Sequence, residues 1–242
     1  MKISVITAFP ELMRSYIASS ILGRAVSSGK LDVRVVDIRD HSEGAYRQID
    51  DYCYGAGGMM LMAEPLAKAL EAVSEGAKPY VVYPSPQGTH LYQELVEDLS
   101  RKEHLVIVCG HYEGIDARVI NEICDEEISI GDYVLTGGET AAIVVIDAVA
   151  RLVPGVLPNE EAYTNESHTD GMLEAPQYTK PPVWHGKEVP EVLKNGNDAA
   201  IADYNRIAAL VDTWHNRPDM LDKLDISESD WAKMLAFERG MC

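Results

Sequence analysis

The 242-residue sequence has few of the features that mark several large protein classes. Its four cysteines, at positions 53, 109, 124 and 242, include no CxxC pair and no regular spacing. A disulfide framework or a structural zinc site is therefore not expected, and a reducing compartment is the simpler interpretation. No HExxH or GxSxG motif occurs, and the seven histidines do not cluster at ligand spacing.

Long hydrophobic runs are also missing. The longest, from Ala141 to Val153, is interrupted by Asp147 and Arg151 and is too short to cross a bilayer. In the N-terminal segment MKISVITAFPELM, a proline and a glutamate interrupt an apolar run too short for a signal peptide. We therefore expect a soluble cytoplasmic protein with no membrane partner.

Positive charge is scarce, since 21 basic residues stand against 39 acidic ones and the net charge is −18. Taken whole, this argues against a nucleic-acid-binding protein, whose footprint is usually basic. The acidity is uneven, however. Residues 51–170 carry six basic and 21 acidic groups, whereas residues 1–50 carry seven and six. A polyanion could therefore still contact the two ends of the chain.

The remaining composition, with 46% hydrophobic and 25% charged residues, is that of an ordinary globular protein. β-Branched runs predict five strands, at Ile3–Thr7, Val33–Ile38, Tyr80–Tyr83, Leu105–Cys109 and Glu127–Ile130. Helical patterns lie between and after them, at 11–28, 64–75, 91–102, 116–122 and 139–152. Strands that alternate with helices predict an α/β protein with a parallel sheet.

The pattern changes after Pro154-Gly155. Residues 158–185 are polar and show little periodicity, which favours a linker or a functional loop. Helical periodicity returns at 199–212 and 225–239, with a break at Arg217-Pro218. We expect a first domain over 1–157, a linker over 158–185 and a small helical domain over 186–242.

Glycine-rich segments follow several predicted strands. They are YGAGG at 54–58, CGHYEG at 109–114 and IGDYVLTGGE at 130–139, with SPQG at 85–88 placed in the same way. The last three stand at carboxyl ends of strands, where open α/β sheets bind ligands. Each loop alone could be an ordinary tight turn that needs glycine at positive φ. Together they favour a cradle for one small molecule.

The motifs also limit what such a cradle would hold. Neither GxGxxG nor GxxxxGK[ST] occurs, so dinucleotide and P-loop phosphate sites have little support. An acidic cradle suits a cationic or neutral adenosyl ligand better than a nucleoside triphosphate. Other polar residues have plain interpretations: His104 as a satisfied strand-edge residue, Arg151 as a cation at a helix C-terminus, and Asp170-Gly171 as a turn.

Several of these segments together are more specific than any one alone. The chain contains CGHYEGID, SIGDYVLTGGE, DAVARLVPGVL, DGMLEAPQYTKP and VPEVL, in this order, with FPE at 9–11 and GRA at 23–25. In this combination the sequence closely resembles the bacterial tRNA (guanine-N1)-methyltransferase family (TrmD type, of the SPOUT class). The resemblance covers nearly the whole chain.

The resemblance implies a deep trefoil knot in the α/β domain, which is a rare exception to unknotted topology. It also implies a C-terminal helical domain, an obligate homodimer, and methyl transfer from S-adenosylmethionine to N1 of the guanosine at tRNA position 37. Family members use Mg²⁺, at a site that the sequence does not identify. The residues implied to bind the methyl donor are Tyr83, Ser85, Pro86, Gly110, Tyr112, Glu113, Ile130, Gly131, Tyr133, Leu135, Gly137 and Gly138.

The implied reaction gives two other residues a role. Guanine N1 carries a proton, and the family's general base matches Asp170. An aspartate at its reference pKa of ~3.9 is a weak base, so its position must supply part of the effect. Negative charge then develops on O6, where the family's arginine, matching Arg151, would stabilise it. Because Arg151 ends a helix and Asp170 lies beyond it in the linker, a site shared between two subunits is plausible.

Two alternatives remain open. The chain could be another knotted RNA methyltransferase that acts on a different base or on a ribose hydroxyl, or a tRNA-binding protein with vestigial donor loops. The sequence also departs from the family pattern at Cys53, Gln177, Lys180 and Asp198, and its glycine-rich run at 54–60 is one residue short. These departures leave Asp170 and Arg151 unchanged.

Overall fold

The computed structural model describes the chain except for residues 56, 75, 77, 159–165 and 240–242. The chain divides into two compact units, Met1–Glu160 and Glu161–Cys242. Each unit is described by itself below. Within the described residues, no helix is both long enough and apolar enough to cross a membrane. The cytoplasmic location stays a prediction.

The first unit is built on a five-stranded sheet in the order β2-β1-β6-β5-β7. All neighbouring strands are parallel, as predicted. Their bounds are β1 Lys2–Thr7, β2 Asp32–Asp37, β5 Tyr80–His90, β6 His104–Val108 and β7 Glu126–Ser129. The five predicted strands are thus confirmed, with β5 longer than expected. His104 begins β6, and its Nε2 lies 2.9 Å from the hydroxyl of Ser4, as expected of a satisfied edge residue.

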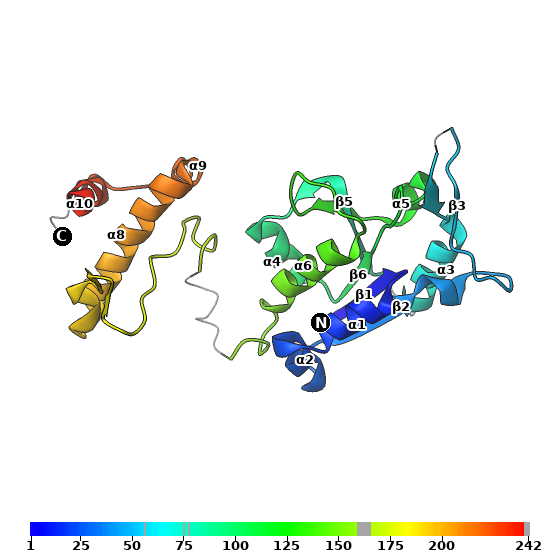
Figure 1. Ribbon diagram of the computed structural model, residues 1–242, viewed down its shortest axis with the longest axis horizontal. Coiled ribbons are helices and arrows are strands. Elements are labelled where there is room, and N and C mark those ends of the chain that lie inside the picture. Colours follow the sequence, from blue (N-terminus) through cyan, green and yellow to red (C-terminus); the bar gives the residue numbers. More distant parts are fainter. Residues whose placement is uncertain (56, 75, 77, 159–165, 240–242) are drawn as a thin grey trace. The chain divides into compact units, whose positions relative to one another are not determined.

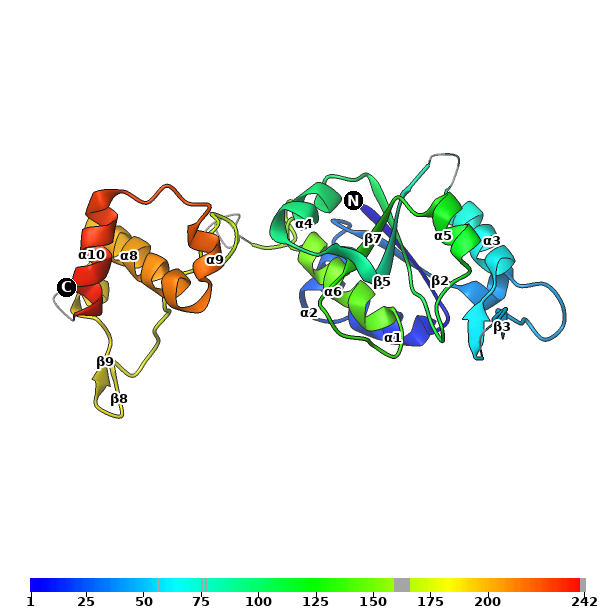
Figure 2. The same ribbon diagram turned by 90° about the horizontal axis from the view of Figure 1, so that it is seen from above.

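Helices cover both faces of the sheet, which explains why the inner strands β1 and β6 are almost entirely buried. Figure 2 shows α1, α2, α4 and α6 on one face and α3 and α5 on the other. Successive residues of β1 point into the two resulting cores: Val5 packs with the first group of helices and Ile6 with the second. The helices are α1 Pro10–Ile17, α2 Ser20–Ser27, α3 Ala63–Ser74, α4 Gln93–Ser100, α5 Ala117–Ile123 and α6 Glu139–Ala150, with a 3₁₀ turn η1 at Ile38–His41.

The predicted helix over 11–28 is wrong in one respect, because the structure has two helices there. Helix α1 ends at Ile17, and the backbone N–H groups of Ala18 and Ser19 donate to carbonyls of its last turn. Ser20 then takes a positive φ of 49°, which redirects the chain into α2. The apolar periodicity continues across this corner, so the pattern alone does not reveal it. The other predicted helices are present, except that residue 75 lies outside the described residues.

Strand β5 differs most from the prediction. It was expected to end at Tyr83 and to be followed by a loop, but it continues to His90 with an irregularity in the middle. Ile128 of β7 is paired with both Pro84 and Thr89, so residues 85–88 loop out of the ladder as a wide bulge. Glycine at position 88 allows the chain to come back to β7 after the bulge. A Cβ there would lie 2.4 Å from the backbone nitrogen of Ile128.

Two short hairpins were not predicted, since strands of two or three residues leave no periodic pattern. In the first unit, β3 (Asp50–Tyr52) pairs with β4 (Met59–Leu61). Isolated bridges join β4 to the segment after β6, between Met60 and Tyr112 and between Leu61 and Ile115. The predicted glycine-rich loop at 54–58 connects the two strands, and its residue 56 lies outside the described residues.

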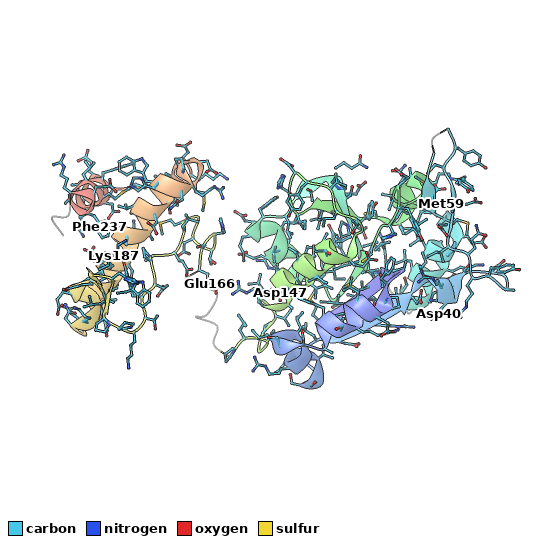
Figure 3. The ribbon with its side chains drawn as sticks, viewed as in Figure 1. Asp40, Met59, Asp147, Glu166, Lys187 and Phe237 are labelled. Carbon is cyan, nitrogen blue, oxygen red and sulfur yellow. The ribbon has the colours of Figure 1, made fainter. Side chains whose placement is uncertain are left out.

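The second unit is mainly helical (Figure 1), as predicted for the C-terminal region. It contains the hairpin β8 Val183–Trp184 and β9 Lys187–Glu188, the 3₁₀ turn η2 Glu191–Lys194, and helices α8 Asp198–Asn216, α9 Pro218–Leu221 and α10 Glu228–Glu238. The predicted break at Arg217-Pro218 is confirmed, because Pro218 begins α9. Residues Ile207, Leu210 and Val211 of α8 pack on Met234 of α10. Phe237 of α10, labelled in Figure 3, contacts Tyr204 of α8.

We predict that Gly88→Ala destabilises the protein by about 1–3 kcal/mol, because the added methyl group would overlap the backbone of β7. Gly57→Ala is the matched control. A Cβ at Gly57 meets no atom within 4 Å, and its φ is not positive, so the change should stay within about 0.5 kcal/mol. Urea unfolding midpoints measure both. Equal midpoints for the two variants would contradict the role given to Gly88.

Candidate active site

A cavity of about 310 Å³ opens at the carboxyl end of the sheet, next to β5, β6 and β7. Its wall comes from three stretches of chain: the β5 bulge at 83–87, the segment after β6 at 110–114, and the segment at 128–138 that links β7 to α6, with Ala141 of α6. Parallel strands end at the same edge of a sheet, which is why segments far apart in sequence meet here.

All twelve residues that the sequence implied for donor binding line this one cavity. Nine further residues do so as well: Pro84, Gln87, His111, Gly114, Ile128, Ser129, Val134, Thr136 and Ala141. Seven of them are direct chain neighbours of the residues implied for donor binding, whereas Ile128 and Ala141 lie two and three positions away. Proximity in sequence was the available signal.

The segments after β6 and β7 are in direct backbone contact. The N–H of Gly138 donates to the carbonyl of Gly110 at 2.7 Å, and His111 forms an isolated bridge with Gly137. A Cβ on Gly138 would lie 2.8 Å from the backbone nitrogen of Gly110. Glycine at 138 is therefore needed for this approach, and the approach closes one side of the cavity.

The bulge and the segment after β7 are held by short side-chain bonds. Ser85 is 5% exposed, and its Oγ accepts from the N–H of Gln87 at 3.3 Å. The Oγ of Ser129 donates to the carbonyl of Gly131 at 3.1 Å. These bonds fix two polar turns of the wall without charged groups.

Charge in and around the cavity is acidic. The described lining residues include Glu113 and neither lysine nor arginine. Burial, followed by the charge of Glu127 and then by Cys124, raises the pKa of the Tyr83 phenol, which therefore stays protonated at neutral pH. Behind the wall, Glu139 begins α6, and its Oε1 accepts a hydrogen bond from the Thr7 hydroxyl at 2.7 Å. Such surroundings favour a cationic or neutral ligand over a phosphate.

Arg151 lies in the first unit, directly after α6. It is the C-cap residue of that helix, and its backbone N–H donates to the carbonyl of Asp147. The predicted position at a helix end is thus confirmed. A cation there is favourable for the helix dipole whatever else it does.

Asp170 lies in the second unit, at an exposed position of a turn. The turn is closed by the N–H of His168, which donates to the carbonyl of Met172 at 2.7 Å. It is anchored on α8, because the N–H of Leu173 donates to the hydroxyl of the buried Thr213 at 2.9 Å, and Met172 packs into the helical core. Glu166, at the beginning of the turn, is labelled in Figure 3. The turn thus holds an exposed carboxylate on a backbone that is hydrogen-bonded to α8.

The Mg²⁺ implied by the resemblance finds no support. Within the described residues, no group of three or more histidine, cysteine, aspartate or glutamate side chains could hold a metal ion.

The comparisons with known proteins all indicate the same family. The family described as tRNA (Guanine-1)-methyltransferase TrmD matches residues 1–223. A tRNA (guanine-N(1)-)-methyltransferase of Ruminiclostridium cellulolyticum is 51% identical over 227 residues, which cover 93% of this chain and 97% of the relative. Relatives of the same description from Moorella thermoacetica and Persephonella marina are 47% and 43% identical. They cover 95% and 100% of this chain, and 94% and 96% of their own.

The family match spans far more than half of the chain, and the relatives are similar to it over almost their whole length. The sheet, its covering helices and the three segments around the cavity all lie within the matched residues 1–223. The chain therefore belongs to the TrmD family of tRNA (guanine-N1)-methyltransferases.

Proposed function

We propose that this protein transfers the methyl group of S-adenosylmethionine to N1 of the guanosine at tRNA position 37, next to the anticodon. Family membership supports the reaction class. The observation that carries the proposal furthest is the convergence of all twelve expected donor-binding residues on a single cavity. Three separate stretches of the chain contribute to it, so the agreement does not follow from sequence proximity.

The cavity suits the donor in size and in charge. Its volume of about 310 Å³ is in the range of small-molecule sites. Backbone N–H and C=O groups of the three segments can bind the polar edges of an adenosyl group, while Tyr83, Tyr112 and Tyr133 offer aromatic surface. The donor supplies an electrophilic methyl group on a positively charged sulfur. A wall with Glu113 and without described basic residues is compatible with that charge.

Two residues would act on the guanine. Asp170 would accept the N1 proton as general base while N1 attacks the methyl carbon. Arg151 would donate hydrogen bonds to O6, where negative charge develops as the proton leaves, and so stabilise the transition state more than the bound substrate. The turn at 168–172 supports this assignment for Asp170, because it holds an exposed carboxylate on α8.

We also propose that the first unit is knotted and that the protein is a homodimer. The contacts between Gly110 and Gly138 and between His111 and Gly137 support the knot, since they pack the segments after β6 and β7 closely together. Exposed apolar side chains on one helical layer support the dimer: Phe9 is 42% exposed, Leu12 50% and Val144 41%. Apolar groups gathered on one layer are typical of a protein interface.

We predict that Asp170→Asn lowers the single-turnover rate of methyl transfer by ~10²–10⁴, the usual contribution of a positioned general base. The amide is nearly isosteric, and the backbone bonds of the turn do not involve the side chain, so the fold should be kept. Equilibrium binding of S-adenosylmethionine should be unchanged, because the cavity contains no part of this turn. Rapid-quench kinetics and calorimetry on the same preparation provide both numbers.

Asp225→Asn is the matched control, since Asp225 is another exposed aspartate of the second unit. It should transfer methyl at the parent rate. If Asp170→Asn also does so, Asp170 is a turn residue only and the proposed mechanism is wrong.

We predict that two inactive variants restore activity when mixed, if Arg151 of one subunit and Asp170 of the other form each site. Random exchange of Asp170→Asn and Arg151→Ala subunits makes half of the dimers mixed. Each mixed dimer has one intact site, so about a quarter of the parent activity should return. A methyl-transfer assay after subunit exchange measures it. A mixture as inactive as its two components would contradict a shared site.

A further inference from the structure

Glu139 is the one charged side chain that is buried among the described residues, with 4% of its surface exposed. Its only partner among them is the Thr7 hydroxyl, which donates to Oε1 at 2.7 Å. Within the described chain no lysine, arginine or histidine forms an ion pair with it. A buried carboxylate without a cation is strongly unfavourable, because it loses hydration and gains little in return. Its presence therefore needs a reason beyond packing.

The carboxylate lies directly behind the wall of the donor cavity. Gly137 and Gly138 line that cavity and precede Glu139 in the chain. A Cβ on Gly137 would lie 2.7 Å from Oε2 of Glu139 and 2.6 Å from Nδ1 of His111. The carboxylate thus lies against Gly137, which lines the cavity, and any side chain at 137 would collide with both groups.

Within the described residues, no hydrogen bond or ion pair joins a cation to this carboxylate. Two titratable groups close to it are His111, whose buried Nδ1 has no hydrogen-bond partner among the described residues, and Cys109. Burial raises the pKa of the Cys109 thiol well above its usual value, and the Glu139 charge raises it further. The thiol therefore stays neutral. The first turn of α6 favours an acidic residue, but that effect is small beside the cost of burying a charge.

We propose that Glu139 is the buried counter-charge for the sulfonium of the methyl donor, and that it makes the cavity prefer the cationic donor over its neutral product. The inference rests on the proposed function and adds a specificity-determining residue to it. When the methyl group moves to N1, the bonding pair stays on sulfur and the sulfonium becomes a neutral thioether. The attraction to Glu139 then disappears, which favours exchange of S-adenosylhomocysteine for new donor.

The test compares two ligands that differ in this one charge. Calorimetry gives the dissociation constants of S-adenosylmethionine and S-adenosylhomocysteine for the parent and for Glu139→Gln. Glutamine keeps the volume and the acceptor for Thr7 but removes the charge. The constant for the donor should rise about tenfold relative to that for the product, which is the effect of one charge pair at partial burial.

Two further variants keep the proposal open to refutation. Thr7→Val removes the hydrogen bond and leaves the charge, so it should change both constants by the same factor. Glu139→Met also removes the charge, with a side chain of similar length that can be buried without a polar partner, so it should reduce the preference for the donor as Glu139→Gln does. This variant serves if Glu139→Gln does not fold.

The outcomes separate two possible failures. If Glu139→Gln or Glu139→Met changes both constants equally, Glu139 has a structural role only and the inference is wrong. If the parent binds neither ligand, the donor cavity of the proposed function is wrong, whatever the variants do.

Discussion

The close approach of two glycine backbones determines the shape of the candidate site. The N–H of Gly138 reaches the carbonyl of Gly110 at 2.7 Å, and even a methyl group at 138 would prevent this. The segments after β6 and β7 can therefore meet at the edge of the sheet and leave a cavity between themselves and the β5 bulge. Gly88 makes the same kind of contact with β7. The geometry of the site thus depends on glycine at positions where no side chain fits.

This construction explains why so few side chains in the cavity have chemistry of their own. The described wall has no basic group, and the one buried charge near it, Glu139, lies behind a glycine. Under the proposed mechanism, the groups that act on the guanine lie elsewhere, with Arg151 after α6 and Asp170 on a turn anchored to α8.

The sequence predicts the five strands and most helices because apolar residues recur at the spacing of each element and form its buried face. It does not predict the corner at Ala18–Ser19, where periodicity continues across a positive φ at Ser20, or the strands β3 and β4, which are too short for a pattern. The donor residues were implied by a resemblance, whereas spacing alone left them as possible turns. The buried charge of Glu139 has no sequence signal, because a glutamate at the first turn of a helix is usually solvated.

A methyl-transfer assay on tRNA transcripts tests the central claim most directly. Two transcripts would be compared that differ only in carrying guanosine or adenosine at position 37. The account predicts that the guanosine transcript gains one methyl group, recovered as N1-methylguanosine after digestion, and that the adenosine transcript gains none. Equal methylation of both transcripts, or a methyl group on another atom of the guanosine transcript, would contradict it.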